Sequence, residues 1–144
     1  MNRQIKLLIV DDENQILSTY KDFFDKRGFL VETAKNGEEG LVKLQNGEFD
    51  VAIVDILMPK MDGLALVEKV SQEGIDTSII ILTGHGEKEH AIKALNLRIV
   101  EAWFEKSTIR LEELLEKVKM LGEVIPIDEV RRILSKLPND NEGE

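Results

Sequence analysis

Cysteine is absent from the 144-residue sequence, which excludes disulfides, thiolate metal sites and cysteine nucleophiles. Aromatic residues are scarce at 5%, so a core must be built mostly from Ile, Leu and Val. Basic residues are outnumbered, because 19 Lys and Arg stand against 28 Asp and Glu, for a formal charge of -9. A chain of this charge repels nucleic-acid phosphates and anionic membrane surfaces, so we expect no direct binding to nucleic acid.

Long hydrophobic runs are missing as well. No run approaches the roughly 20 apolar residues of a membrane-spanning helix, so we expect no membrane insertion. The start, Met-Asn-Arg-Gln, passes directly into a strand pattern without the apolar core of a signal peptide. The length and the hydrophobic content of 42% fit one compact domain, and we expect a soluble, cytoplasmic protein.

Four short hydrophobic runs are present, and each stops at polar or charged residues. They are residues 7–10 before Asp11 and Asp12, residues 51–54 before Asp55, residues 79–82 before Thr83, and residues 103–104 before Glu105 and Lys106. If the runs are neighbouring parallel strands, their carboxyl ends share one edge of the sheet. Three carboxylates, a hydroxyl and an ammonium then converge, and such a site can hold a divalent cation and a phosphoryl group.

Amphipathic stretches alternate with these runs, which predicts a doubly wound parallel sheet with helices on both faces. The first helix is expected between Asp12 and Gly28, and residues 30–34 form a further strand. Asn36 and Asp62 are candidate caps of the next two helices. We expect the last helix of this alternation to open at Ser107 or Thr108. The order of strands in the sheet does not follow from the order in the sequence.

The chain after residue 122 is predicted to be an extension of the main domain, which we place at residues 1–122. Within residues 123–144, residues 126–137 form a short amphipathic helix, and the acidic end from Pro138 onward is expected to be disordered. The helix is too short to be a second domain. Its apolar positions could contact a partner, but packing on the main domain is the preferred prediction; they are Ile127, Val130, Ile133, Leu134 and Leu137.

Four motifs between about residues 4 and 121 together resemble a response-regulator receiver domain of two-component signalling. They are Leu7-Leu8-Ile9-Val10-Asp11-Asp12-Glu13, Val54-Asp55-Ile56-Leu57-Met58-Pro59-Lys60-Met61-Asp62-Gly63, Leu82-Thr83-Gly84 and Phe104-Glu105-Lys106. The resemblance implies an α/β, flavodoxin-like, five-stranded parallel sheet in the order 2-1-3-4-5. It also implies that a histidine kinase or phosphotransfer protein transfers a phosphoryl group to one aspartate.

The chemistry of phosphoryl transfer accounts for the acidic residues. A carboxylate that attacks a phosphoryl group faces an anion, so a dication must neutralise charge between them. We assign Asp55 as the nucleophile, and Asp11 and Asp12 as hard oxygen ligands suited to Mg2+. The resemblance implies that Asp12 and Asp55 bind the metal directly, that Asp11 binds through water, and that the backbone carbonyl of Leu57 completes the protein ligands.

Three other residues are expected to bind the phosphoryl group or respond to it. Lys106 supplies a point charge for a phosphoryl oxygen, and the Thr83 hydroxyl can donate a hydrogen bond to the same group. The resemblance places a switching aromatic residue at Trp103, which is expected to turn inward after phosphorylation. Ser107 departs from the family, which usually has proline after the lysine, so the fifth loop could differ.

Signalling through protein contacts is the leading function, with an unknown downstream protein or a second copy of the chain as partner. A phosphorylation-independent interaction module on the same fold is the alternative. A dedicated enzyme is not expected, because an aspartate-nucleophile phosphatase ordinarily has a second acid at the position of Leu57. A flavin-binding protein is disfavoured, because Asp11 and Asp12 would repel the cofactor phosphate.

Overall fold

The hydrophobic runs form a five-stranded, all-parallel sheet in the order β2-β1-β3-β4-β5, as predicted. The computed structural model describes residues 4–58, 60–84, 88–123 and 127–138. The strands are β1 Lys6–Val10, β2 Leu30–Ala34, β3 Val51–Asp55, β4 Ser78–Thr83 and β5 Val100–Glu105. The helices are α1 Asn14–Asp25, α2 Gly37–Asn46, α3 Gly63–Gln72, α4 Lys88–Leu95, α5 Leu111–Gly122 and α6 Ile127–Ser135.

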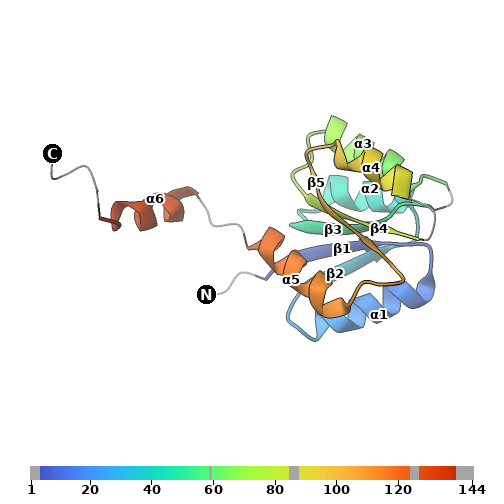
Figure 1. Cartoon of the computed structure of the whole chain (residues 1–144), viewed down its shortest axis with the longest axis horizontal. Coiled ribbons are helices and arrows are strands. Elements are labelled where there is room, and N and C mark those ends of the chain that lie inside the picture. Colours follow the sequence, from blue (N-terminus) through green and yellow to red (C-terminus); the bar gives the residue numbers. More distant parts are fainter. Residues whose placement is uncertain (1–3, 59, 85–87, 124–126, 139–144) are drawn as a thin grey trace.

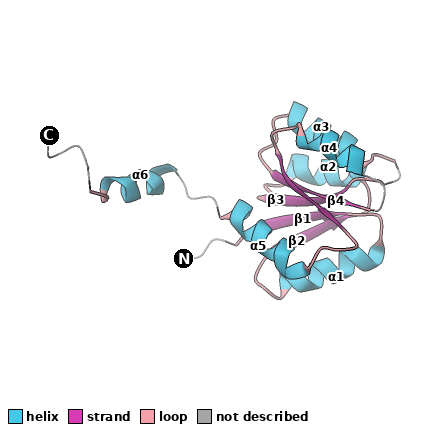
Figure 2. Ribbon diagram, in the orientation of Figure 1, coloured by secondary structure: helices cyan, strands magenta, loops and turns pink. Residues whose placement is uncertain are grey.

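Helices cover both faces of the sheet, because the side chains of the central strands alternate between two buried clusters. Leu7 and Ile9 of β1 pack in the cluster that includes residues of α1 and α5. Leu8 and Val10 pack in the cluster formed with α2, α3 and α4. Figures 1 and 2 show these two helical layers on opposite sides of the strands. No described helix is long and apolar enough to cross a membrane.

Two predicted helix caps are confirmed, and both lie near the carboxyl edge of the sheet. The Asn36 side chain accepts a hydrogen bond from the Glu39 backbone N–H at 2.9 Å. The Asp62 side chain accepts from the backbone N–H of Ala65 at 2.8 Å, which starts α3. These caps satisfy N–H groups that have no partner within the helix. They fix where the loops around Asp55 end and the helices begin.

The predicted start of α5 at Ser107 or Thr108 is wrong. The backbone N–H groups of Thr108 and Ile109 both donate to the Glu105 carbonyl, at 3.3 and 3.0 Å, and form a turn after β5. Arg110 is then extended, with φ -95° and ψ 141°, and the helix begins at Leu111. Serine and threonine suit turns as well as caps, so their presence did not locate the first helical residue. No cis peptide bond occurs in the described residues, including the bond between Lys106 and Ser107.

The strands β4 and β5 pair with one irregularity. Ile79 is paired with Val100, whereas the next residue, Ile80, is paired with Ala102. Glu101 is therefore the extra residue of a bulge. Trp103, two positions later, packs against the cluster on the α2–α4 face.

The amphipathic helix of the extension forms as α6, but its predicted packing on the main domain is wrong for the part that the structure describes. Leu134 and Leu137 are 59% and 57% exposed. Figure 1 shows α6 apart from the sheet and its covering helices. The acidic end beyond Pro138 lies outside the described residues.

Candidate functional site

The carboxyl edge of the sheet brings the predicted acidic residues and Lys106 together. Asp11 directly follows β1, Asp55 is the last residue of β3, and Lys106 directly follows β5. Asp11 and Asp55 are buried, whereas Asp12 is exposed. The parallel sheet places these three strand ends at one edge, although the residues are far apart in the sequence.

Lys106 forms the centre of this arrangement. Its Nζ lies 2.8 Å from Asp11 Oδ2, 3.1 Å from Asp55 Oδ2 and 3.3 Å from Glu13 Oε1. The side chain of Lys106 is 15% exposed, and that of Asp55 is 5% exposed, so their pair is only weakly screened by water. One cation thus partly neutralises two buried carboxylates and one exposed carboxylate.

The acidic residues fit a divalent cation. Asp11, Asp12 and Asp55 each offer a carboxylate oxygen, and these atoms lie within 4.8 Å of one another. Ligands on opposite sides of one Mg2+ are about 4 Å apart, and waters commonly complete its shell. Among the described residues, the buried Oδ2 of Asp11 has the ion pair with Lys106 but no well-aligned hydrogen bond. A metal or its bound water would satisfy that oxygen.

Burial changes the protonation of the site. It raises the pKa of Asp55 from the ordinary 3.8 to about 7, with a further increase from Asp11 that Lys106 opposes. Burial also raises the pKa of Asp11, although Lys106 and the backbone N–H of Glu13 oppose that effect. Burial alone would lower the pKa of Lys106, but its contacts with Asp11 and Asp55 raise it overall. Without a metal, the site therefore holds a protonated amine and a partly protonated Asp55 at neutral pH.

Mg2+ binding is expected to weaken as the pH falls below about 7, because the metal must displace a proton from Asp55. The affinity should fall about tenfold per pH unit well below that pKa and level off above it. Without metal, the folded state holds this proton more tightly than the unfolded state, so the stability contributed by Asp55 falls as the pH rises from about 4 to 7.

Isothermal titration calorimetry with Mg2+ at about pH 6, 7 and 8, in buffers of different ionisation enthalpy, measures the Mg2+ affinity and the number of protons released on binding. We expect about one proton to be released per metal at the lowest pH and close to none at the highest. The same affinity and no proton release at all three pH values would contradict the assignment of Asp55 as a metal ligand.

The three remaining predicted site residues lie around the acidic cluster. Thr83 ends β4 and is buried, and its hydroxyl donates to the Phe104 carbonyl at 3.3 Å, toward β5. Trp103 is half-buried on the α2–α4 side. The Leu57 side chain is 45% exposed. Thr83 therefore has a weak existing hydrogen bond that it would have to exchange to reach a group on Asp55.

Sequence reasoning missed Glu13, which received no role although it follows the acidic pair. Its backbone N–H donates to Asp11 Oδ1 at 2.9 Å, which orients that carboxylate. Its own side chain accepts a hydrogen bond from Lys106 instead of capping α1. The residues of that pair are 93 positions apart, so no local pattern could have revealed it. A third acid beside the pair was the only available signal.

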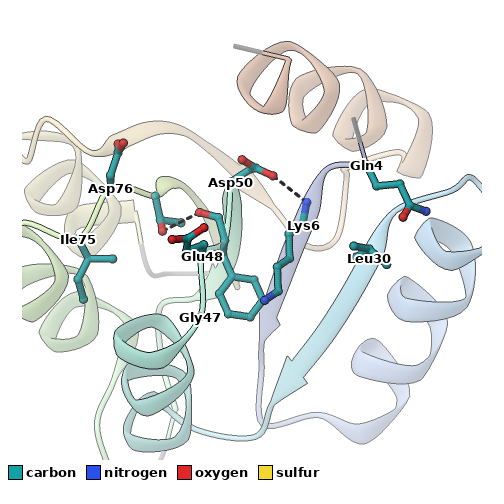
Figure 3. Close-up of a pocket in the computed structure, with 10 residues that line it drawn as sticks. Gln4, Lys6, Leu30, Gly47, Glu48, Asp50, Ile75 and Asp76 are labelled. Carbon is teal, nitrogen blue, oxygen red and sulfur yellow. Dashed lines mark hydrogen bonds between the residues drawn. The ribbon is translucent and has the colours of Figure 1, made fainter. Parts of the chain in front are cut away.

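A hollow of about 500 Å³ lies at the opposite edge of the sheet, where the strands begin (Figure 3). Polar groups in its wall bond to one another: the backbone N–H of Lys6 donates to Asp50 Oδ2 at 2.8 Å, and the Thr77 hydroxyl donates to the Phe49 carbonyl at 2.9 Å. This hollow contains none of the predicted site residues. The carboxyl edge therefore remains the functional site.

The sequence from residue 7 to residue 119 matches the family described as the response regulator receiver domain. The chain is 31% identical over 93 residues to the transcriptional regulatory protein DltR of Streptococcus agalactiae, which covers 65% of this chain and 42% of DltR. It is 34% identical over 91 residues to the response regulator SaeR of Staphylococcus aureus, covering 63% of this chain and 40% of SaeR. The matches thus span about two fifths of these curated relatives.

Solved structures agree with this match. A CheY-like receiver domain protein from Methanospirillum hungatei is 34% identical, with a TM-score of 0.76 over 82% of this chain and 93% of that chain. The response regulator TrrA from Thermotoga maritima, in complex with Mg2+-BeF, is also 34% identical, with a TM-score of 0.70 over 82% of this chain and 99% of that chain. The cluster of Asp11, Asp12 and Asp55 is typical of the Mg2+ site of receiver domains.

One conclusion follows from the flavodoxin-like strand order, the acidic cluster with its lysine and the family match. Receiver domains partner with histidine kinases, and they are signalling modules rather than dedicated enzymes. The chain belongs to the response regulator receiver domain family, the phosphoacceptors of two-component systems.

Proposed function

We propose that Asp55 of this chain accepts a phosphoryl group from a histidine kinase or a phosphotransfer protein. The observation that carries the proposal is the buried contact of Asp55 with Lys106, at 3.1 Å, beside a carboxylate cluster that fits Mg2+. An isolated turn-forming aspartate would need neither feature. The predicted interaction module that works without phosphorylation has no observation in its favour.

The proposed reaction follows from the positions of the side chains. A carboxylate oxygen of Asp55 attacks the phosphorus of a phosphohistidine, the P–N bond breaks, and the leaving imidazole keeps the bonding electrons and takes up a proton. Lys106 then exchanges its contact with Asp55 for a phosphoryl oxygen. Asp11 and Asp12, with Asp55 and the Leu57 carbonyl, would hold Mg2+, which neutralises charge on the transferring oxygens when bound.

Intact-mass spectrometry after incubation with acetyl phosphate and Mg2+ tests the proposal. We expect one phosphoryl adduct, which disappears in Asp55→Asn and when Mg2+ is chelated. Asp62→Asn is the matched control, because Asp62 caps α3 and has no proposed chemical role. An adduct that persists in Asp55→Asn would overturn the assignment. The absence of any adduct in the native chain, with either acetyl phosphate or a phosphorylated histidine donor, would favour the module that works without phosphorylation.

We further propose that Thr83 and Trp103 carry the signal from Asp55 to the surface. Thr83 would give up its bond of 3.3 Å to the Phe104 carbonyl and donate to the phosphoryl group instead. Trp103 lies one residue before Phe104 on β5 and would turn further inward as that strand adjusts. The surface formed by α4, β5 and α5 would then differ between the two states and bind a downstream protein.

The fluorescence of Trp103, the only tryptophan, is expected to shift when Asp55 is phosphorylated. Thr83→Val should still accept the phosphoryl group but lose most of the shift, because valine keeps the shape and lacks the hydroxyl. Thr77→Val is the control, since Thr77 is also buried but bonds at the opposite edge of the sheet. An unchanged spectrum in a fully phosphorylated native sample would contradict the coupling.

The family match at residues 7–119 supports a receiver domain at residues 1–122 and an extension at residues 123–144. A cytoplasmic location follows from the proposed reaction, because a cytoplasmic kinase domain must reach Asp55. The proposed partners are the phosphoryl donor and a downstream protein.

A further inference from the structure

The strand β2 forms one open edge of the sheet that the described residues build, in the order β2-β1-β3-β4-β5. Its five residues pair with β1 in unbroken register, from Leu30 opposite Lys6 to Ala34 opposite Val10. The other edge strand, β5, carries the bulge at Glu101. A regular open edge can accept a further strand, whereas a bulge disturbs such pairing. The β2 edge is therefore the one that needs another form of protection.

Alternate residues of β2 direct their backbone groups away from the sheet. The backbone N–H of Leu30 donates to the carbonyl just before β1, and the Ala34 carbonyl accepts from the backbone N–H just after β1. Leu30 and Ala34 thus face β1, and the backbone groups of a strand alternate in direction. The carbonyls of Val31 and Thr33 therefore point outward, where a further strand would bond to them.

Two lysines already bind these outward carbonyls. Lys21 of α1 donates from Nζ to the Val31 carbonyl at 3.3 Å, and Lys43 of α2 donates from Nζ to the Thr33 carbonyl. The helices α1 and α2 cover opposite faces of the sheet, so the two lysines reach the edge from both sides (Figure 1). A further strand would find both of its acceptors on β2 occupied.

Carboxylates hold the two lysines in place. Asp25 Oδ2, one turn after Lys21 on α1, lies 2.8 Å from the Lys21 Nζ. Glu39 Oε1, one turn before Lys43 on α2, lies 3.9 Å from the Lys43 Nζ, and Glu32 Oε1 of β2 lies 4.0 Å from it. The Lys43 side chain is only 33% exposed, so it lies along the surface instead of extending into solvent. An incoming strand would have to separate both ammonium groups from a carbonyl and from these carboxylates.

We propose that Lys21 and Lys43 block strand addition at β2, and that a second copy of the chain pairs with this edge once both are removed. A second copy offers the same open edge, and a twofold axis at Val31 places the two β2 strands antiparallel. Each Glu32 then lies opposite Leu30 of the other copy, so the two glutamates stay apart. In the native chain the same pairing would bring the ammonium groups of both copies together, and they repel.

Sedimentation velocity of Lys21→Met/Lys43→Met over a wide concentration range tests the proposal. We expect this variant to associate about tenfold or more tightly than the native chain, because both carbonyls lose their donors while the side-chain length is kept. Lys26→Met/Lys69→Met is the matched control, since it removes the same charge from two exposed lysines outside the edge and should sediment like the native chain. A Lys21→Met/Lys43→Met variant that sediments like the native chain, or a control that associates as strongly, would overturn the proposal.

Proline at the edge identifies the surface that associates. The Thr33 N–H points outward, so Thr33→Pro removes no bond to β1 but obstructs a further strand. Added to the variant that lacks both lysines, this change should restore the native sedimentation. Amide hydrogen exchange gives the same information without a change of backbone, because pairing at the edge should slow exchange at Val31 and Thr33. Association that persists with the proline, or unchanged exchange at these two amides in an associated sample, would exclude the edge.

The block at β2 is independent of phosphorylation, because β2 contains none of the residues assigned to the acidic site. Failure of either edge experiment would leave the assignment of Asp55 as phosphoacceptor unaffected. A chain that accepts no phosphoryl group would likewise leave the role of Lys21 and Lys43 unchanged.

Discussion

Lys106→Met is expected to slow phosphorylation of Asp55 by acetyl phosphate about 100-fold, a loss typical of removing one charged stabiliser of a developing anion. The same substitution should tighten Mg2+ binding at least tenfold, because the native Nζ lies 2.8 and 3.1 Å from two carboxylates of the metal site and repels a second cation. The variant keeps most of the length of the side chain, so these effects come from the charge.

Two measurements separate these effects. Calorimetric titration gives the affinity for Mg2+, and time-resolved intact-mass analysis gives the rate of phosphorylation at saturating metal. Lys35→Met removes an exposed lysine just beyond β2 and should change neither value appreciably. If Lys106→Met weakened both metal binding and phosphorylation, the lysine would act mainly by holding the carboxylates in place.

Gly63→Ala is expected to destabilise the fold by about 3 kcal/mol or more, near or above the usual cost of overpacking. A Cβ at Gly63 would overlap the carbonyl oxygen of Asp55 and lie 2.8 Å from the Ile56 Cα. Both obstacles are backbone atoms of the strand end that carries the phosphoacceptor, so no side chain can rotate away. The backbone N–H of Gly63 also donates to the Ile56 carbonyl at 2.8 Å, which holds the two segments together.

Equilibrium unfolding in urea measures this loss, and the fraction that remains folded should accept a phosphoryl group more slowly because Asp55 is displaced. Gly40→Ala is a suitable control in α2, because its Cβ would meet only side-chain atoms, the nearest being 3.1 Å away on Val10. That change should stay within about 1 kcal/mol of the native stability, since better helix propensity offsets slight crowding. Equal stability of both variants would show that the α3 start can move away from β3.

Much of the fold was predictable because local signals agreed with one another. Asn36 and Asp62 cap the helices at which they were expected, since a side-chain oxygen three residues before an N–H is a local arrangement. The start of α5 was missed because the turn after β5 depends on backbone bonds to Glu105, which the residue types do not specify. Strand order came only from the family resemblance, because alternation allows several orders.

The candidate site was likewise predictable where local signals sufficed and unpredictable where distances across the fold decide. Asp11, Asp55 and Lys106 were predicted because each follows or ends a hydrophobic run, and the sheet brings such positions together. The simultaneous contact of Lys106 with Asp11, Glu13 and Asp55 was not predictable, since it depends on distances across the sheet edge. The raised pKa of Asp55 likewise results from burial by the whole fold.

Glu101 is the extra residue of β5 in its pairing with β4, and it determines which of the two helical layers Trp103 packs against. Ile81 pairs with Trp103 only because Glu101 is unpaired. If Glu101 were instead paired with Ile80 in a regular ladder, Trp103 would pair with Leu82, whose side chain packs in the cluster on the α1 and α5 face. The indole would then belong to the other half of the protein, and Lys106 would be drawn about 3.3 Å along the strand, out of reach of its carboxylates. The bulge at Glu101 thus determines both the helical layer toward which Trp103 can pass the signal and whether Lys106 reaches the carboxylates of the site.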